Sequence, residues 1–404
     1  MFNRLITLFF PLLYIINKVF PINRDRVLFC TKSGQFNGNA KYFFYYLIQK
    51  KAKHPIWKAN DEKNYNNLCE EFGTNNIFLS KGFIGKIRYI LNYLTAGTII
   101  IRGRTDAWDL MRLGNRKKRK IINVGHGIVG PGMKRGGAIW NSGSKKKIKQ
   151  EQKMRRAVSH YITSSDLMRY VVAAGTSVEI NKIYITGMPR NDHFVNARKN
   201  IGSIIKKIKS LVRTNIDIQK VILYAPTHRD GNTTRFFPFD DFSISHLQNI
   251  LIKNKAIMLL RTHDQQNKFL NDELGNFKEY TNDRIFYFSH FLLSDINEII
   301  PGVDLLLSDY SSITSDYLLV DKPIIYIPYD LLTYGRGIHF SDYDNWTPGP
   351  KVYTSESFYS AIEQSLTDPI KYSSDRKKLK NFLHKYFDSN SCERLLGLIN
   401  RKVQ

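Results

Sequence analysis

Short runs of β-branched and aliphatic residues alternate along the chain with longer stretches that have helical spacing. In the first half, the runs that predict buried strands are Arg26–Cys30, Thr98–Ile101, Ile121–Val124, His160–Thr163 and Lys182–Thr186. The stretches with helical spacing are Asn39–Lys50, Gly82–Leu94, Lys147–Val158 and Asp166–Ala174. Because strands that alternate with helices form parallel sheets with crossover helices, this half predicts an α/β domain.

The second half of the chain repeats this pattern. Its predicted elements are strands at Lys220–Ala225, Ala256–Arg261, Asp304–Ser308 and Pro323–Ile327 and a helix at Ser311–Val320. A polar, lysine-rich stretch from Asn196 to Asp217 separates the two series. We therefore predict an α/β fold of two Rossmann-like domains, residues 23–210 and 211–385, whose parallel sheets face a central cleft. Residues 386–404 are expected to form a C-terminal helix that can pack back on the first domain.

Residues 1–22 form a separate segment. Leu5–Ile16 is almost wholly apolar, but it contains Pro11 and is flanked by Arg4 and Lys18. It is too short and too interrupted to span a bilayer, which takes about 20 apolar residues. Two interpretations remain open: an amphipathic helix in the membrane interface with its cations on anionic headgroups, or a first helix packed on its own domain. We designate residues 1–22 a membrane-associating segment, because the charge of the chain favours that interpretation.

The chain is strongly basic, with 61 Lys and Arg residues against 35 Asp and Glu residues and a formal net charge of +26. Since 42% of its residues are hydrophobic, it is not a disordered polybasic tail. Runs of cations lie mainly before residue 210, for example at 116–120 and 206–209. Such an excess attracts anionic lipid, a polyanionic polymer or nucleic acid. No nucleic-acid-binding motif occurs, so we expect no nucleic-acid partner.

The cysteines and carboxylates exclude several kinds of site. Cys30, Cys69 and Cys392 are far apart and match no metal-binding spacing, so they exclude a disulfide framework and a zinc ribbon. No group of Asp and Glu residues has the spacing of a divalent-metal site. We therefore expect no tightly bound cofactor or metal, with Asp309 and Asp316 as the candidates for a loosely held magnesium.

The segment Asp304–Tyr329 gives the most information about a candidate binding site. A predicted strand ends at Ser308, and a polar turn that contains Asp309 and Ser311 leads into a helix. Ser and Asp at a helix start satisfy its open N–H groups. The same N–H groups, at the positive end of the helix dipole, can also bind an anion. Capping and anion binding both remain open for these residues.

A histidine between two glycines follows the strand Ile121–Val124, where an open α/β sheet places its ligands. Glycine permits a tight turn and a close approach of the backbone to a ligand. His126, with an ordinary pKa near ~6.5, is suited to accept a proton near neutral pH, and a structural histidine is the alternative. After the strand Lys182–Thr186, Arg190 and Asp192 either reach a ligand or pair with each other.

Two strands of the second half end in cations. The sequence LYAPTHRD places Thr227 and Arg229 just after one strand, and LLRTHD places Arg261 and His263 at the end of the next. Arg and His side chains at neighbouring strand ends can hold a diphosphate through charge-assisted hydrogen bonds.

Taken in order, these segments resemble those of the CDP-glycerol glycerophosphotransferase family, which builds teichoic acids and related capsule polymers. The matching pieces are NGNAKYFFYYL near residue 40, INVGHGI followed by MK, YITGMPRND, YAPTHRD, LLRTHD, the block LLLSDYSSITSDYLLVDKPIIYIPYDLLTYGRG and the Pro-Gly-Pro at 348–350. The resemblance covers the chain from about residue 25 to 385.

The resemblance implies a GT-B fold and a phosphotransferase. The enzyme would move an alditol phosphate, with glycerol phosphate the first choice, from CDP-glycerol or CDP-ribitol to a hydroxyl of a lipid-linked anionic polymer and release CMP. The catalytic candidates are His126 as the base and His263 at the diphosphate. The substrate-binding candidates are Gly127, Arg190, Thr227, Arg229, Arg261, Asp309, Ser311, Ser312, Asp316 and Arg336. The resemblance also implies peripheral binding to the anionic membrane surface at its cytoplasmic face.

Departures from the family pattern leave the acceptor and the alditol open. Gly125 stands where the family often carries a bulkier residue, and His228 where an aromatic residue is usual. The alternative enzyme is a GT-B glycosyltransferase that extends a cell-surface glycan from a nucleotide-sugar. An alternative of another class is a non-catalytic basic protein that binds nucleic acid or membrane.

Overall fold

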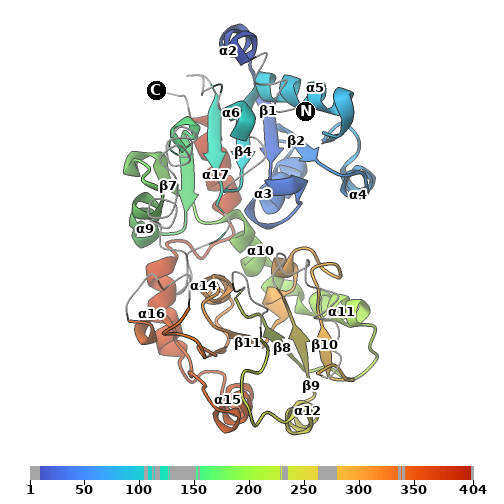
Figure 1. The fold of residues 1–404 in the computed structure, drawn as a ribbon, viewed down its shortest axis with the longest axis vertical. Helices are drawn as coiled ribbons and strands as arrows, with labels where there is room; N and C mark the ends of the chain where they lie inside the picture. The colour runs from blue at the N-terminus through green and yellow to red at the C-terminus, as the bar shows by residue number, and fades with distance from the viewer. Residues whose placement is uncertain are drawn as a thin grey trace. The chain divides into compact units, whose positions relative to one another are not determined.

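Two parallel sheets, one of seven strands and one of five, organise the chain into two units (Figure 1). The structure is a computed structural model that describes residues 10–103, 108–111, 113, 119–125, 127, 152, 155–227, 229, 235–262, 280–334, 338 and 342–401. Among these, residues 10–127, 152–192 and 388–401 belong to the first unit and residues 193–387 to the second, apart from the gaps.

The sheet of the first unit has the strand order β3-β2-β1-β4-β5-β6-β7, and all its neighbouring strands are parallel. Its strands are β1 (Asn23–Cys30), β2 (His54–Ala59), β3 (Ile77–Leu79), β4 (Ala96–Ile101), β5 (Lys120–Asn123), β6 (His160–Thr163) and β7 (Ile183–Ile185). Its helices in the described ranges are α2 (Phe10–Val19), α3 (Gly38–Lys50), α4 (Glu62–Phe72), α5 (Gly82–Thr95), α6 (Trp108–Met111), α9 (Asp166–Thr176) and α17 (Ser391–Asn400). All five strands predicted in this half are present, within a residue or a few at their ends.

Alternate residues of β1 build the two faces of this core. Val27 and Phe29 pack against α3 and α17 on one face of the sheet, whereas Leu28 and Cys30 pack against α5 on the other. This alternation follows from the two-residue period of a strand. Because both faces are covered, the strands read in the sequence as continuous apolar runs.

The sheet of the second unit has the order β10-β9-β8-β11-β12 and is also parallel. Its strands are β8 (Lys220–Tyr224), β9 (Ala256–Leu260), β10 (Ile285–Tyr287), β11 (Leu305–Ser308) and β12 (Ile324–Tyr326). Its helices are α11 (Ile201–Val212), α12 (Ile244–Lys253), α14 (Ile313–Tyr317), α15 (Ser355–Thr367) and α16 (Ser373–Leu383), and α10 (Pro189–Ala197) precedes them. Among the described residues, the 3-10 helices are η1 (Lys32–Gly34), η2 (Ile180–Lys182), η3 (Arg198–Asn200), η5 (Ile296–Glu298), η6 (Ile300–Gly302) and η7 (Asp344–Trp346).

The chain passes from the first unit to the second within α10, between residues 192 and 193, whereas the sequence placed the boundary between 210 and 211. The lysine-rich helix α11 belongs to the second unit because it buries Ile204 and Ile208. Ile204 lies so close to Gly302 that a Cβ on that glycine would come within 2.6 Å of it. Polar composition made an amphipathic helix resemble a linker.

Helix α17, the last in the chain, belongs to the first unit and is held at both ends by buried charges. The carboxylate of Asp192 accepts hydrogen bonds from the backbone N–H groups of Ser391 at 2.9 Å and Cys392 at 2.8 Å. At the other end, Lys120 Nζ donates to the carbonyls of Leu398 and Ile399, both at 2.8 Å. An acid at the N-terminus and a cation at the C-terminus complement the helix dipole.

Helix α2 is fixed to its own unit by Arg119, which is 1% exposed. The guanidinium donates to Asn17 Oδ1 of α2 at 2.9 Å and to the carbonyls of Leu94 at 2.7 Å and Ala96 at 3.1 Å, where α5 ends and β4 begins. Helix α2 is therefore held to its own unit through Asn17, while Leu12, Ile15 and Val19 stay exposed, so both interpretations of the N-terminal segment remain open. In the described ranges, no helix combines the length and the apolar character that crossing a bilayer requires.

The pKa of His160 makes the first unit sensitive to acid. Burial, and to a smaller extent the charge of Lys120, lowers this pKa to about 4 from an ordinary value of 6.5. His160 is the first residue of β6, and its imidazole lies against the ring of Tyr184, with 5.0 Å between ring centroids. Since the unfolded chain binds the proton more readily, the contribution of His160 to stability is complete above about pH 6.5 and is lost as pH falls toward about 4.

We expect His160→Asn to lose less of its free energy of unfolding than the wild type when pH is lowered from about 6.5 to about 4, because it removes this titration. Urea unfolding at the two pH values measures the difference. Equal losses in the two proteins would contradict the assignment.

Candidate functional site

Polar residues of the second half, among them the predicted Thr227, Arg229 and Asp309, meet at the carboxyl ends of β8, β11 and β12, which are neighbours in the sheet. Thr227 and Arg229 follow β8, Asp309 follows β11 and Asp330 follows β12. In a parallel sheet the carboxyl ends of the strands lie at one edge, and ligands bind there. This edge is the candidate ligand-binding site of the second unit.

Asp309 connects the ends of β8 and β11 and is only 1% exposed. Its Oδ1 accepts hydrogen bonds from the backbone N–H of Thr227 at 2.8 Å, the hydroxyl of Thr227 at 2.5 Å and the N–H of Tyr310 at 2.6 Å. Its Oδ2 lies 2.8 Å from Arg229 Nη1. A buried carboxylate is stable only with partners of this kind. Asp309 therefore joins two strand ends, and capping of the following helix is not its role.

Helix α14 is shorter than the predicted helix Ser311–Val320, since it spans five residues before the chain continues in turns. Its dipole is correspondingly weaker. Ser311 and Ser312 are half-buried at its start, and Ser311 Oγ accepts a hydrogen bond from the N–H of Ile313 at 3.4 Å. Asp316 is buried within the helix. The two serines, rather than the dipole, are thus the polar groups that this turn offers to a ligand.

The guanidinium of Arg261 is turned toward the neighbouring strand end. Arg261 Nη1 donates to the carbonyls of Ser289 at 2.7 Å and Phe288 at 3.2 Å, just after β10. The remaining predicted site residues lie partly beyond what the structure describes: His126, His263 and Arg336 fall outside the described residues, and Gly127 is described as half-buried. The roles of these residues stay predictions.

In the first unit, two asparagines join the three motifs at the carboxyl edge of the sheet. Asn123 Oδ1 accepts a hydrogen bond from the N–H of Gly125 at 2.9 Å, where a φ of 66° requires the conformational freedom of glycine. Asn39, which is fully buried, donates through Nδ2 to the carbonyl of Val124 at 2.9 Å and accepts from the N–H of Arg190 at 3.3 Å. The segments NGNAK, INVGHG and GMPRND therefore form one hydrogen-bonded cluster.

For the pair Arg190 and Asp192, the structure shows which groups the carboxylate of Asp192 binds. Asp192 binds the N-terminus of α17, so the two residues of the GMPRND turn do not simply neutralise each other. Arg190 is 6% exposed beside Asn39, and its contact with a substrate stays a prediction.

The sequence pattern did not indicate Asp330, Asn39 or Asn123 as site residues. Asp330 could have been found, because it follows the predicted strand Pro323–Ile327 in the segment PYDLL and so lies at the same sheet edge as Asp309. The sequence contains no comparable indication for the two asparagines. Asn39 bonds to a residue that is distant in the sequence, and both asparagines bond to backbone atoms, which a side-chain pattern does not reveal.

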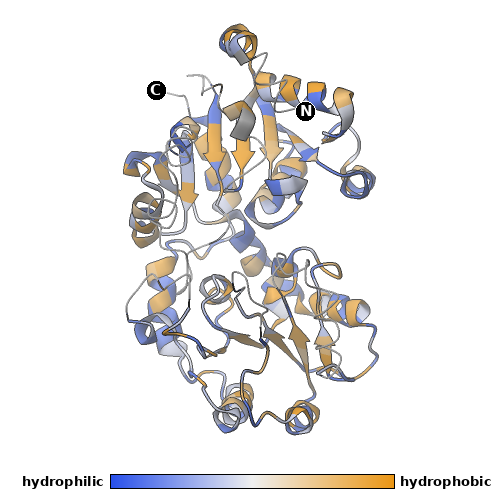
Figure 2. Ribbon diagram, viewed as in Figure 1, coloured by the Kyte–Doolittle hydropathy of each residue, from blue (hydrophilic) through white to orange (hydrophobic). Residues whose placement is uncertain are grey.

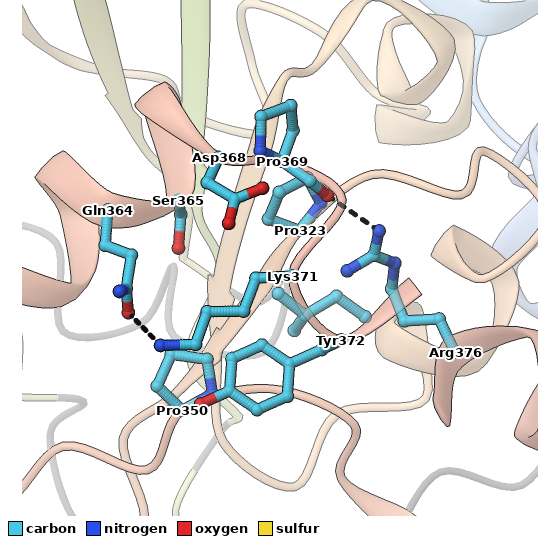
Figure 3. A pocket seen from close by; sticks show the side chains of 10 residues that line it. Pro323, Pro350, Gln364, Ser365, Asp368, Pro369, Lys371, Tyr372 and Arg376 are labelled. Carbon is cyan, nitrogen blue, oxygen red and sulfur yellow. Dashed lines mark hydrogen bonds between the residues drawn. The ribbon is translucent and has the colours of Figure 1, made fainter. Parts of the chain in front are cut away.

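A small hollow lies at the opposite, amino-terminal end of β12 (Figure 3). Its walls are Pro323, Ile324, Pro350, Gln364, Ser365, Asp368, Pro369, Lys371, Tyr372 and Arg376. Figure 3 shows that both of its basic side chains have hydrogen-bond partners within the hollow. Lys371 donates to Gln364 at 2.8 Å, and Arg376 donates to the carbonyl of Pro369 at 2.8 Å. The adjoining Gly349 permits close packing, because a Cβ there would lie 2.0 Å from the carbonyl oxygen of Ile324. The Pro-Gly-Pro motif is therefore structural.

The architecture of two parallel α/β units, each with polar residues at the carboxyl ends of its strands, is that of a GT-B-like fold. A solved structure of the wall teichoic acid polymerase TagF, a histidine-to-alanine variant, matches it with a TM-score of 0.75 and 18% identity, over 97% of this chain and 92% of that chain. The predicted GT-B-like fold class is confirmed.

The chain belongs to the CDP-glycerol:poly(glycerophosphate) glycerophosphotransferase family, whose model matches residues 12–401. A teichoic acid poly(ribitol-phosphate) polymerase of Bacillus spizizenii is 32% identical over 238 residues, which are 58% of this chain and 36% of that protein. A teichoic acid glycerol-phosphate primase of Bacillus subtilis is 29% identical over 310 residues, 74% of this chain and 73% of that protein. The predicted family is confirmed.

Replacing Asp309 with Asn should lower the free energy of unfolding by roughly 3–5 kcal/mol, because it leaves the buried Arg229 without one of its charged partners. The control is Asp344→Asn, which breaks an ion pair with Lys351 in which the Asp344 side chain is 80% exposed, and which should cost about 0–1 kcal/mol. Urea unfolding measures both, and equal costs would show that the burial of Asp309 is not what matters.

Proposed function

We propose that this protein transfers an alditol phosphate, with glycerol phosphate the first choice, from a CDP-alditol to a hydroxyl of a lipid-linked teichoic-acid-like polymer and releases CMP. The observation that carries the proposal is the family match over residues 12–401. The polar strand ends around Asp309 support the second unit as the donor site, and the excess of cations suits a polyanionic acceptor.

In the proposed reaction, the oxygen of the acceptor hydroxyl attacks the β-phosphorus of the CDP-alditol. A new phosphorus–oxygen bond forms while the bond from the β-phosphorus to the bridging oxygen breaks, and CMP leaves with that electron pair. His126 takes the proton of the attacking hydroxyl. Charge that develops on the nonbridging oxygens needs preorganised donors, and His263 is the candidate beside the diphosphate.

The hydrogen bonds of the second unit divide its hydroxyl groups into two roles. The hydroxyl of Thr227 donates to Asp309, so Thr227 supports the loop. Ser311 Oγ instead accepts from a backbone N–H, so its own hydrogen can donate to a phosphoryl oxygen. We assign Ser311, together with Ser312, to the β-phosphate.

Incubation with CDP-glycerol or CDP-ribitol and a lipid-linked acceptor should release CMP and add a phosphodiester-linked alditol, as mass spectrometry of the product would show. His126→Ala should lower kcat by about 10²–10⁴-fold, the usual contribution of a general base. Consumption of a nucleotide-sugar instead, with release of a nucleoside diphosphate, would support the glycosyltransferase alternative.

We also propose that the first unit binds an anionic membrane surface through α2 and α5. Apolar side chains are exposed on both helices, among them Val19 at 74% and Phe83 at 73%, and Figure 2 shows the hydrophobic residues along these helices. Arg119 bonds to Asn17 and to Leu94, so it holds α2 at the end of α5. An exposed apolar surface on a protein of charge +26 suits insertion among acyl chains beside anionic headgroups.

The double variant Ile15→Asp, Ile84→Asp should bind vesicles of phosphatidylglycerol and phosphatidylcholine at least about tenfold more weakly than wild type. The reason is that each apolar side chain that becomes buried among the acyl chains contributes roughly 1.5–3 kcal/mol to binding. Both residues are exposed, at 59% and 69%. The matched control is Ile370→Asp, an exposed isoleucine of the second unit. Vesicle sedimentation measures binding, and an equal loss in the control would refute the α2–α5 surface.

A further inference from the structure

Arg229 is held by carboxylates on two sides. Its Nε and Nη2 form a bidentate pair with the Oδ2 and Oδ1 atoms of Asp330 at 2.8 and 2.9 Å. Its Nη1 lies 2.8 Å from Asp309 Oδ2 and also donates to the carbonyl of Thr227 at 2.5 Å. We call the chain of Asp309, Arg229 and Asp330 the carboxylate–arginine bridge.

Aromatic rings enclose the same guanidinium. The rings of Tyr310, Tyr329 and Tyr334 have their centroids 5.2, 5.2 and 5.0 Å from Arg229 Cζ. Tyr310 also donates its hydroxyl hydrogen to Asp330 Oδ1 at 3.0 Å. Burial, with the nearby charges of Asp330 and Asp309, raises the pKa of Tyr310, so this hydroxyl stays protonated and keeps donating. Asp330 is therefore held on both sides.

These contacts occupy the two parallel N–H groups of Arg229 that would otherwise bind a phosphate. Bidentate recognition of a phosphate takes two parallel N–H groups of the guanidinium, and Asp330 already occupies Nε and Nη2. The opposite nitrogen, Nη1, donates to the carbonyl of Thr227 and forms an ion pair with Asp309 Oδ2. A diphosphate could form a bidentate pair with Nε and Nη2 of Arg229 only by displacing Asp330.

The carboxylate–arginine bridge also spans three strand ends. Through Thr227 and Arg229 it holds the segment after β8, through Asp309 the segment after β11 and through Asp330 the segment after β12. Tyr343 adds a hydrogen bond from its hydroxyl to the carbonyl of Asp309 at 3.0 Å. The half-buried Ser311 lies two residues beyond Asp309, so the bridge fixes the turn that carries it.

We propose that Asp330 and Arg229 are positioning residues of the donor site, which set the turn of Ser311 and Ser312, and that Arg229 is not a ligand of the diphosphate. The inference rests on the proposed function for its ligand, a cytidine diphosphate group. It replaces the role that the family resemblance implied for Arg229 and gives Asp330 a role that the sequence did not suggest.

The decisive variant is Asp330→Asn, tested with CDP as the probe by titration calorimetry beside Arg229→Met and the double variant. For the carboxylate–arginine bridge, each single variant weakens CDP binding by about tenfold and the double variant is no weaker than the worse single variant, because both break one unit. If Arg229 instead binds the diphosphate, Asp330→Asn leaves CDP affinity unchanged or tighter, since it releases the guanidinium fork and removes a negative charge. That result would overturn the proposal.

A matched control separates positioning from general destabilisation. Asp321→Asn breaks another buried arginine's ion pair, with Arg376 Nε at 3.5 Å, at the amino-terminal edge of the same sheet. It should lower stability and leave CDP affinity at the wild-type value. Loss of CDP affinity in this control as large as that in Asp330→Asn would also overturn the proposal.

Unfolding measurements without nucleotide keep the inference distinct from the proposed function. A double-mutant cycle of Asp330→Asn and Arg229→Met should show strong coupling whether or not CDP is the ligand. If the wild type does not bind CDP, the proposed donor is wrong, and additive unfolding energies would refute the carboxylate–arginine bridge itself. In turnover assays, Asp330→Asn should raise the KM for CDP-glycerol, and Asp321→Asn should not.

Discussion

The buried carboxylate of Asp309 is the group on which the arrangement of the second unit's site depends. A carboxylate removed from water has to be met by donors, and the chain supplies them from the ends of two adjacent strands and from Arg229. Because these donors are backbone N–H groups and a rigid guanidinium, their positions are fixed to within hydrogen-bond tolerance. The need to neutralise one charge thus determines where three loops run at the ligand-binding edge.

Much of the fold follows from local patterns, and its exceptions have physical causes. Segments such as Thr98–Ile101 and Asp304–Ser308 read as strands because burial on both faces makes them continuously apolar. The strand β2 was not predicted because His54, Pro55 and Lys58 interrupt its apolar run, and the short strands β3 and β10 were missed as well. The boundary was misplaced because α11 carries lysines on one face, and composition does not reveal that Ile204 and Ile208 are buried on the other.

The candidate site was predictable as a set of positions but not as a set of contacts. Polar residues just after apolar runs identify a sheet edge, which is why Asp309 and Arg229 were found. Whether Asp309 caps its own helix or bonds across to Thr227, 82 residues earlier, depends on tertiary structure alone. The same holds for Asn39 and Val124, which are 85 residues apart, and for Arg229 and Asp330, which are 101 apart.

The position of α17 has a consequence for the order in which the molecule can assemble. The first unit is synthesised first, yet Asp192 and Lys120 find their partners in residues 391–399, after the whole second unit has been made. A nascent chain would therefore carry two charges near an incomplete apolar face, the face that Leu395 and Leu398 later cover. The first unit can therefore complete its fold only after α17 has been synthesised, so the two units cannot fold independently of each other during synthesis.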